Sequence, residues 1–147
     1  MADKPFLSAA FLCEKVLRET DDVLTAVRIV DTFYVSVPKD LPVEIKPTIQ
    51  MTVFLSFVRV SATNAGKHQA LIRVYKPSGA PLGEDGPLKL DLVFREEGVA
   101  KCNLIISLGL GIQEFGQHRI DVSLDDKLVT KIPFRLLERP EPAKTVQ

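Results

Sequence analysis

Apolar and polar residues alternate with a period of two along most of the chain. Between Leu88 and Phe94 every second residue is apolar, and similar alternation runs through residues 48–60 and 100–110. Successive side chains of a β-strand point to opposite faces of a sheet, so each segment offers one face to a core and a more polar face to solvent. Strands that are half exposed to solvent are typical of antiparallel sheets.

Turn signals separate these segments. Most connections are short and rich in Pro, Gly or Asp, and one longer crossover runs from Pro38 to Pro47. We expect eight strands, at residues 8–18, 23–37, 48–60, 68–76, 87–96, 100–110, 117–124 and 128–137. Their number and spacing predict an all-β fold, an antiparallel two-sheet β-sandwich of immunoglobulin-like or related Greek-key topology. A small barrel is the less favoured alternative.

The first of these segments admits a second interpretation. A short helix would place four apolar residues at helical spacing, namely Phe6, Ala10, Cys13 and Leu17. A strand that ends in a turn at residues 20–22 agrees better with the β-rich segment that follows. We therefore predict a strand over 8–18 and keep the helix as the alternative.

The last strand and its surroundings carry three further signals. The Asp-Asp pair at 125–126 stands where a tight hairpin turn is expected, and Pro133 favours a sheet edge because it has no N–H to donate. Residues 138–147 are polar and Pro-rich, which predicts a flexible tail. We expect one domain over 1–147 with an ordered core over about 6–137.

Composition excludes several classes of function. The 147 residues include 19 Lys and Arg and 19 Asp and Glu, so the chain has no general attraction to nucleic acid or to an anionic membrane. The sequence shows neither a secretory pattern nor a membrane span, and we expect a cytoplasmic protein. In that compartment Cys13 and Cys102 are expected to stay reduced.

The two histidines occupy similar contexts, Gly-x-His followed by alternating apolar residues. His68 and His118 share the parity of the apolar faces of their strands. We interpret both as residues at the rim of the core, each with a ring nitrogen on a nearby carbonyl. A paired metal or acid–base site is less favoured, because no Cys or acidic residue accompanies them at ligand spacing. We predict no catalytic residue, no metal and no cofactor.

Seven acidic residues lie in expected loops, which leaves calcium binding open. Calcium needs six to eight oxygen ligands, and some β-sandwiches supply them from the loops at one end. Solvated turn residues are the more favoured interpretation. The acidic residues are Asp21, Asp22, Asp40, Glu84, Asp85, Asp125 and Asp126.

Four apolar residues fall on the expected outward faces of their strands. They are Leu71, Tyr75, Val93 and Ile105. If one sheet gathers them, they form an exposed apolar patch, and such patches often mark interfaces. If they are scattered singly, they need no functional explanation.

Two stretches resemble known families. The closing stretch "GQHRIDVSLDDKLVTKIPFRL" is similar to the last hairpin of immunoglobulin-like sandwiches, with His118 in place of the usual Tyr. The opening stretch "AAFLCEKVLRETDDVLTAVRIVDTFYVSVP" resembles the start of a small family of uncharacterised bacterial proteins, in which a Leu-Cys-acid strand is followed by a second strand, a Phe-containing segment and Pro. That resemblance could extend over most of residues 8–137. It implies a bacterial, cytosolic β-sandwich and assigns no catalytic residue.

We therefore expect a non-catalytic interaction or assembly module. It would bind a protein partner or a second copy of itself through a sheet face or a sheet edge, without nucleic acid or membrane. The alternative is a module that binds a ligand or calcium through its loops. An enzyme centred on His68 and His118 ranks last, because no nucleophile, base and orienting group can be assembled from the sequence.

Overall fold

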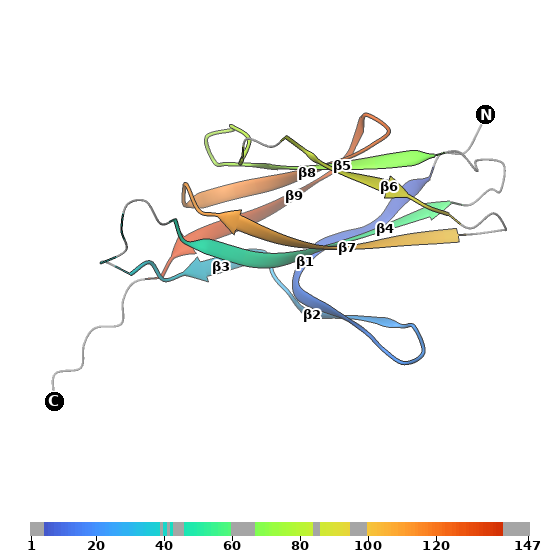
Figure 1. Ribbon diagram of the computed structural model, residues 1–147, viewed down its shortest axis with the longest axis horizontal. Coiled ribbons are helices and arrows are strands. Elements are labelled where there is room, and N and C mark those ends of the chain that lie inside the picture. The colour runs from blue at the N-terminus through green and yellow to red at the C-terminus, as the bar shows by residue number, and fades with distance from the viewer. Residues whose placement is uncertain are drawn as a thin grey trace.

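The computed structural model describes residues 5–38, 40, 42, 46–59, 67–83, 86–94 and 100–139, and their regular structure consists of β-strands alone (Figure 1). The all-β prediction is therefore confirmed. The nine strands are β1 (Phe6–Arg18), β2 (Leu24–Ile29), β3 (Thr32–Val35), β4 (Thr48–Arg59), β5 (His68–Tyr75), β6 (Leu88–Leu92), β7 (Ala100–Gly111), β8 (Gly116–Leu124) and β9 (Lys127–Glu138).

Two sheets contain these strands. Sheet A has the order β2-β1-β4-β7 and is antiparallel throughout. Sheet B has the order β3-β9-β8-β5-β6, and β3 runs parallel to β9. The expectation of strictly antiparallel sheets is thus wrong for this one pair. In Figure 1 the β5, β6 and β8 strands form the upper layer and β1, β4 and β7 lie beneath them.

The segment 23–37 forms two strands instead of the single one expected. The N–H of Val30 still donates to the carbonyl of Leu12 in β1 at 3.0 Å, whereas the carbonyl of Asp31 accepts the N–H of Arg135 in β9 at 2.8 Å. The chain therefore leaves sheet A and enters sheet B between two successive residues. A parallel partner becomes reachable because the chain crosses from one sheet to the other without reversing direction.

The segment 8–18 is a strand, so the helical alternative is wrong. The strand begins earlier than expected, at Phe6, and its register with β4 shifts between Leu7 and Ala9. Such a bulge inserts one extra residue and reverses the alternation of side chains. As a result Leu7 and Ala10, three residues apart, both pack against the core. The bulge explains why the sequence alternates poorly there.

The core lies between the two sheets. Most of its buried members come from alternate positions of β4 in sheet A and of β5, β8 and β9 in sheet B, and β1, β6 and β7 add Leu12, Leu92 and Ile106. They include Met51, Val53, Leu55, Phe57, Ala70, Ile72, Val74, Ile120, Val122, Ile132, Phe134 and Leu136. The core positions of β4 are thus every second residue, as the alternation through residues 48–60 predicts.

The β8–β9 hairpin closes through the expected two-residue turn. Asp125 and Asp126 have φ angles of 48° and 67°, and positive φ at both central residues matches the right-handed twist of the flanking strands. Pro133 lies on β9 opposite Arg119 of β8, while β3 pairs with β9 only from Arg135 onward. Pro133 thus stands on an inner strand of sheet B, but at a place where β3 does not extend beside it.

β9 ends at Glu138, at the start of the segment 138–147 for which the sequence predicts a tail. Glu138 belongs to the strand and is paired with Val35, and the N–H of Arg139 donates to the carbonyl of Val35 at 2.8 Å. The described part of this segment thus comprises Glu138 and Arg139. The rest of the expected tail, residues 140–147, lies outside the described residues.

Candidate interaction surfaces

The side of sheet A that points away from the core carries three rows of side chains across β1, β4 and β7. We call these nine residues the sheet A face. The register places three residues in each row: Ala9, Ser56 and Asn103; Phe11, Phe54 and Ile105; Cys13, Thr52 and Ser107. None of the nine is charged. Cys13, Thr52 and Ser56 are buried, whereas the three members on β7 are exposed, and charged residues are common at exposed sheet positions.

The middle row is apolar along its whole length. The rings of Phe11 and Phe54 stack with centroids 5.0 Å apart and an interplanar angle of 23°. Ile105 stands beside Phe54 on β7 and is 41% exposed. A stacked aromatic pair next to an exposed branched side chain gives a rigid apolar strip, which loses little side-chain entropy when another surface covers it.

Three polar members of the sheet A face, Ser56, Asn103 and Thr52, are hydrogen-bonded within the molecule. Ser56 Oγ donates to Asn103 Oδ1 at 2.7 Å, and Thr52 Oγ1 donates to the carbonyl of Glu14 at 3.3 Å. Ser8 Oγ donates to the carbonyl of Ser56 at 3.1 Å. Covering a polar group costs most when it loses water and gains no partner. Ser56 and Thr52 keep their partners when the face is covered, so their burial costs little.

The outward side of sheet B has a different character. Arg119 lies over the ring of Tyr75, with Cζ 4.3 Å from the ring centroid, and its Nε donates to Asp121 at 3.0 Å. Arg73 is paired with Asp121, and Lys89 is paired with Leu71. Charges of both signs therefore surround the apolar side chains of this surface, as on an ordinary solvated sheet.

The four apolar residues singled out in the sequence do not share one sheet. Leu71 and Tyr75 lie on β5 of sheet B, and Val93, which is 81% exposed, follows β6 at the edge of the same sheet. Ile105 lies on β7 of sheet A. The expected patch is thus divided, and only Ile105 belongs to the sheet A face.

The ring of His118 is buried, 1% exposed, and stacks on Phe134 with centroids 5.1 Å apart. Its Nδ1 lies 3.1 Å from the carbonyl oxygen of Gly116. This is the carbonyl contact that the sequence predicts for both histidines. His118 therefore sits among the buried residues of sheet B, where it contributes packing at the end of the core.

His68 contacts a carboxylate instead of a carbonyl. Its Nδ1 lies 2.6 Å from Asp125 Oδ2, and Asp125 Oδ1 accepts the N–H of Gln69 at 3.0 Å. The carbonyl of Gln69 in turn accepts the N–H of Asp125 at 2.9 Å. Both carboxylate oxygens of Asp125 thus hold the β8–β9 turn against the start of β5. The ring of His68 also meets Phe94 edge-on, with centroids 6.2 Å apart.

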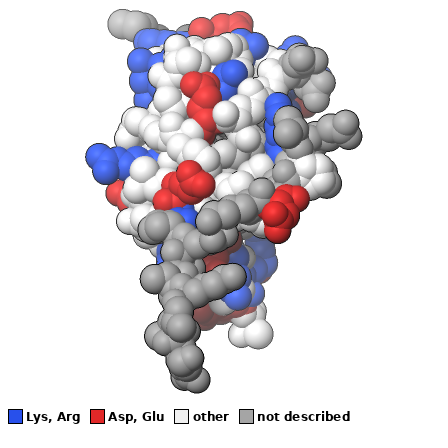
Figure 2. Space-filling view, turned by 90° about the vertical axis from the view of Figure 1, so that its left-hand side faces the viewer, with Lys and Arg blue, Asp and Glu red and all other residues white. Residues whose placement is uncertain are grey.

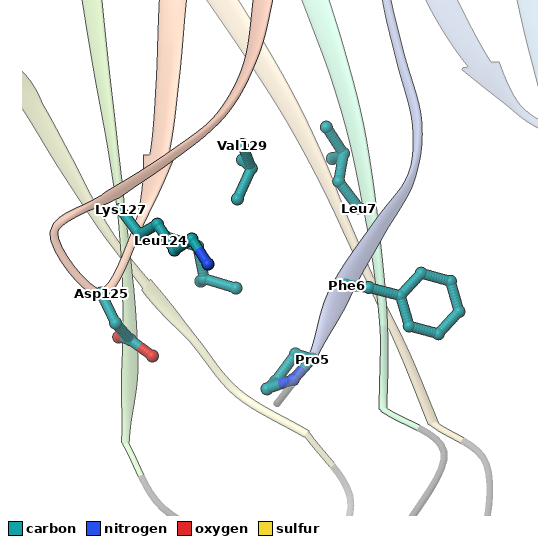
Figure 3. Close-up of a pocket in the computed structure, with 7 residues that line it drawn as sticks. All are labelled: Pro5, Phe6, Leu7, Leu124, Asp125, Lys127 and Val129. Carbon is teal, nitrogen blue, oxygen red and sulfur yellow. The ribbon is translucent and has the colours of Figure 1, made fainter. Parts of the chain in front are cut away.

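A pocket of about 340 Å³ opens beside this turn, between the start of β1 and the β8–β9 hairpin. Figure 3 shows Leu7, Leu124 and Val129 around it, while the ring of Phe6 points away from it. Asp125 and Lys127 stand on the turn at its rim. The pocket is mainly apolar, and the one carboxylate beside it is bonded to His68 and Gln69.

The acidic residues of the turns do not gather in the part of the chain that is described. No group of three or more His, Cys, Asp or Glu able to hold a metal ion occurs among those residues. Asp21 and Asp22 lie at the tip of the β1–β2 hairpin, whereas Asp125 and Asp126 lie in the β8–β9 turn. Two of the residues named for calcium, Glu84 and Asp85, lie outside the described residues.

Both cysteines are free thiols. Cys13 is fully buried in the sheet A face, between its partners Thr52 and Ile29, and burial raises the pKa of its thiol. The thiolate is the reactive form of cysteine, so the thiol of Cys13 has low reactivity at neutral pH. Cys102 is half-buried on β7, with its side chain packed against the core.

The profile of a family of unknown function, DUF6941, matches residues 8–137, which is most of the chain. The chain belongs to DUF6941. No curated protein matches the sequence. Membership agrees with the expected family of uncharacterised proteins, while a bacterial source and an immunoglobulin-like relationship stay predictions.

The charge distribution of this DUF6941 protein is mixed. Figure 2 shows Lys and Arg interspersed with Asp and Glu on the end of the molecule that faces the viewer, with uncharged surface between them. The described part of the chain contains no helix of the length and hydropathy that a membrane span requires.

The sequence missed Phe11 and Phe54 as members of a surface. Phe54 interrupts the polar positions of β4, which are Gln50, Thr52 and Ser56, and this was the only signal along the chain. A single apolar residue on a polar face is common and carries no information by itself. Only the register, which aligns Phe54 with Phe11 and Ile105, turns three separate residues of this DUF6941 protein into one strip.

Proposed function

We propose that the protein is a non-catalytic β-sandwich module that binds another protein surface through the sheet A face. The apolar row of Phe11, Phe54 and Ile105 carries this proposal. An uncharged, rigid strip that crosses three strands of a sheet has the composition of the core of a protein–protein interface, where aromatic residues are enriched and charged residues depleted. Its polar neighbours support the same function, because their hydrogen bonds survive burial.

The contrast between the two outward surfaces supports the choice of sheet A. On sheet B, Arg73, Lys89, Asp121 and Lys131 lie on the outward side, and covering that side would remove several charges from water. The nine residues of the sheet A face carry no charge, and Lys101 is the one charged residue of β7 beside them. The proposed setting is the cytoplasm, and the two free thiols agree with it.

A matched pair of variants tests which surface binds. Phe11→Gln removes an aromatic ring from the sheet A face, and Leu71→Gln makes the equivalent change on the outward side of sheet B. Both residues are half-buried in their strands. Proteins captured by the tagged wild type from the source cells are identified by mass spectrometry, purified, and titrated against all three forms by isothermal titration calorimetry.

We expect Phe11→Gln to weaken binding of the purified partner at least tenfold, because it removes one ring of the stacked pair, and Leu71→Gln to leave binding within twofold. Loss of binding in Leu71→Gln alone would move the function to sheet B. Equal binding by all three forms would refute both surfaces. Far-UV circular dichroism of each variant confirms that the sheets are intact.

A further inference from the structure

β7 forms one edge of sheet A, and the described part of the chain places no strand beyond it. The strand has 12 residues. The other edge strands of the two sheets are shorter, with 6 residues in β2, 4 in β3 and 5 in β6. β7 is therefore the longest edge, and it presents the largest number of backbone groups to a neighbour.

The hydrogen-bond pattern shows which residues of β7 point to this edge. The N–H of Ile112 donates to the carbonyl of Pro47 at 2.8 Å, and this pair continues the register of the β4–β7 ladder. Hydrogen-bonded pairs alternate along an antiparallel ladder. Even-numbered residues from Ala100 to Leu110 therefore bond to β4. Odd-numbered residues from Lys101 to Gly111 direct their N–H and C=O groups away from β4, toward the open edge.

This edge lacks the features that normally prevent strands from pairing. Proteins protect long edges with charged residues, Pro or bulges. From Cys102 to Gly111 the sequence has no charged residue and no Pro, and the register with β4 is continuous along the whole strand. The other edges differ, because β6 carries Lys89 and Asp91, and β2 contains Arg28 with a φ angle of 52°.

We propose that β7 pairs with β7 of a second copy of this chain, antiparallel and about a two-fold axis at Ile105. The proposal extends the proposed function but rests on different atoms, namely the backbone groups of the edge. In this register Ile105 faces its own copy, Asn103 faces Ser107, and Lys101 faces Gly109. All of these are odd-numbered positions, so each pair exchanges backbone hydrogen bonds that the single chain leaves unused.

The side chains favour a second copy as the occupant. Asn103 Oδ1 accepts the hydroxyl of Ser56, which leaves the amide N–H groups of Asn103 to donate to Ser107 Oγ across the axis. Lys101 is the only charged residue of β7. Antiparallel pairing separates the two copies of Lys101 by about eight residues, roughly 27 Å along the strands, whereas parallel pairing in register would place them side by side.

The pair at the ends is also compatible. Lys101 of one copy lies opposite Gly109 of the other, where the Gln50 amide nitrogen is 2.9 Å from the position a Cβ would take. The side chain of Lys101 would therefore lie next to Gly109 and Gln50, which are uncharged. Closed two-fold pairing uses the same residues on both chains, which is why one self-complementary strand is sufficient.

The dimer would join two sheets A into one sheet of eight strands. The apolar row would then run without a break from Phe11, Phe54 and Ile105 of one copy to the same three residues of the other. On the core side the partly exposed Leu104 and Leu108 of the edge would be covered as well. The interaction surface of the proposed function would double in length.

Sedimentation velocity over a concentration series tests the proposal, with Ser107→Pro as the decisive variant. Ser107 directs its N–H to the open edge, so proline there removes no bond to β4 and obstructs only the neighbouring chain. Ser107→Ala keeps the N–H and is the matched control. We expect a dimer for the wild type and for Ser107→Ala, and a monomer with an unchanged circular dichroism spectrum for Ser107→Pro.

Hydrogen exchange read by NMR gives a second, independent readout. In the dimer the amides of Asn103, Ile105 and Ser107 become protected, while those of Leu104 and Ile106 are protected in monomer and dimer alike. A wild-type chain that stays monomeric up to about 1 mM would overturn the proposal. So would a dimer that survives Ser107→Pro, or one whose odd-numbered amides exchange rapidly.

Phe11→Gln separates this proposal from the proposed function. Phe11 lies two strands away from the edge of β7, so this variant should remain dimeric even though it loses the partner protein. If the wild type is a monomer and Phe11→Gln still loses the partner protein, the dimer is overturned and the proposed function is not.

Discussion

Two phenylalanines of the same strand test which side of sheet A forms the core. Phe57 and Phe54 lie three positions apart on β4 and therefore point to opposite faces. Phe57 is 0% exposed and belongs to the core between the sheets. Phe54 lies on the sheet A face, half-buried and stacked on Phe11. The change to alanine is chemically identical at the two positions, so any difference in stability comes from the surroundings.

The expected magnitudes follow from burial. Phe57→Ala removes a fully buried ring and leaves a cavity, which costs about 3–5 kcal/mol of the free energy of unfolding. Phe54→Ala removes a ring that is only partly buried, together with its stack on Phe11, and about 1–2 kcal/mol is lost. For a chain of this length 1 kcal/mol corresponds to roughly 2–4 °C in Tm. We therefore expect Phe57→Ala to lower Tm by roughly 10 °C or more, and Phe54→Ala by about 5 °C.

Urea titrations followed by far-UV circular dichroism measure both changes, since the chain has no Trp to report by fluorescence. They are best done at low protein concentration, where association does not add to the stability of the wild type. An unchanged m-value shows that the two variants unfold from comparable states. The reasoning fails if Phe54→Ala destabilises the monomer as much as Phe57→Ala, because the outward side of β4 would then be a second core.

Two further predictions concern the cysteines and the β8–β9 turn. A maleimide reagent should label Cys102 at least roughly 100-fold faster than Cys13, because Cys13 reacts only after β1 separates from its neighbours. Equal labelling rates in native buffer would contradict the burial of Cys13. As the control, the labelling rate of Cys13 should rise in urea. Asp125→Ala should lower the free energy of unfolding by about 1–2 kcal/mol, because it removes the acceptor of Gln69 N–H and the partner of His68. Asp125→Asn keeps a side-chain oxygen and tolerates the positive φ angle, so thermal melts should show a clearly smaller loss.

The sequence predicts most strands because their period of two is a local property. Every expected segment contains at least one strand, including 8–18, where the choice against a helix was correct. The division of 23–37 could not be seen, because β-rich residues continue from Leu24 to Val35 on both sides of the crossing. The change of sheet depends on hydrogen bonds to strands that are distant in sequence: Val30 bonds to Leu12 in sheet A, and Asp31 bonds to Arg135 in sheet B. No local sequence pattern indicates such long-range partners.

The candidate surface was only partly predictable for the same reason. Ile105 stood out because it is apolar at an outward position, and it lies on the sheet A face. Leu71 and Tyr75 stood out equally, but they lie among the charges of sheet B. Periodicity gives the face of each strand separately. It does not say which strands are neighbours, and the row of Phe11, Phe54 and Ile105 exists only through the order β1-β4-β7.

The alternation along β7 separates stability from association. Even-numbered residues of the strand bond to β4 and turn their side chains to the core, whereas odd-numbered residues carry both the sheet A face and the open edge. A change at Ile106, for example Ile106→Ala, should therefore lower stability and weaken association only as far as the fold itself is lost. Ser107→Pro at the neighbouring position should abolish association while the monomer keeps its Tm, and Ser107→Ala should change neither. If Ile106→Ala and Ser107→Pro instead both lowered Tm and association in proportion, the open edge of β7 would contribute to the stability of the monomer as the core does. The alternation along β7 would then give no support to the dimer or to a separate binding face.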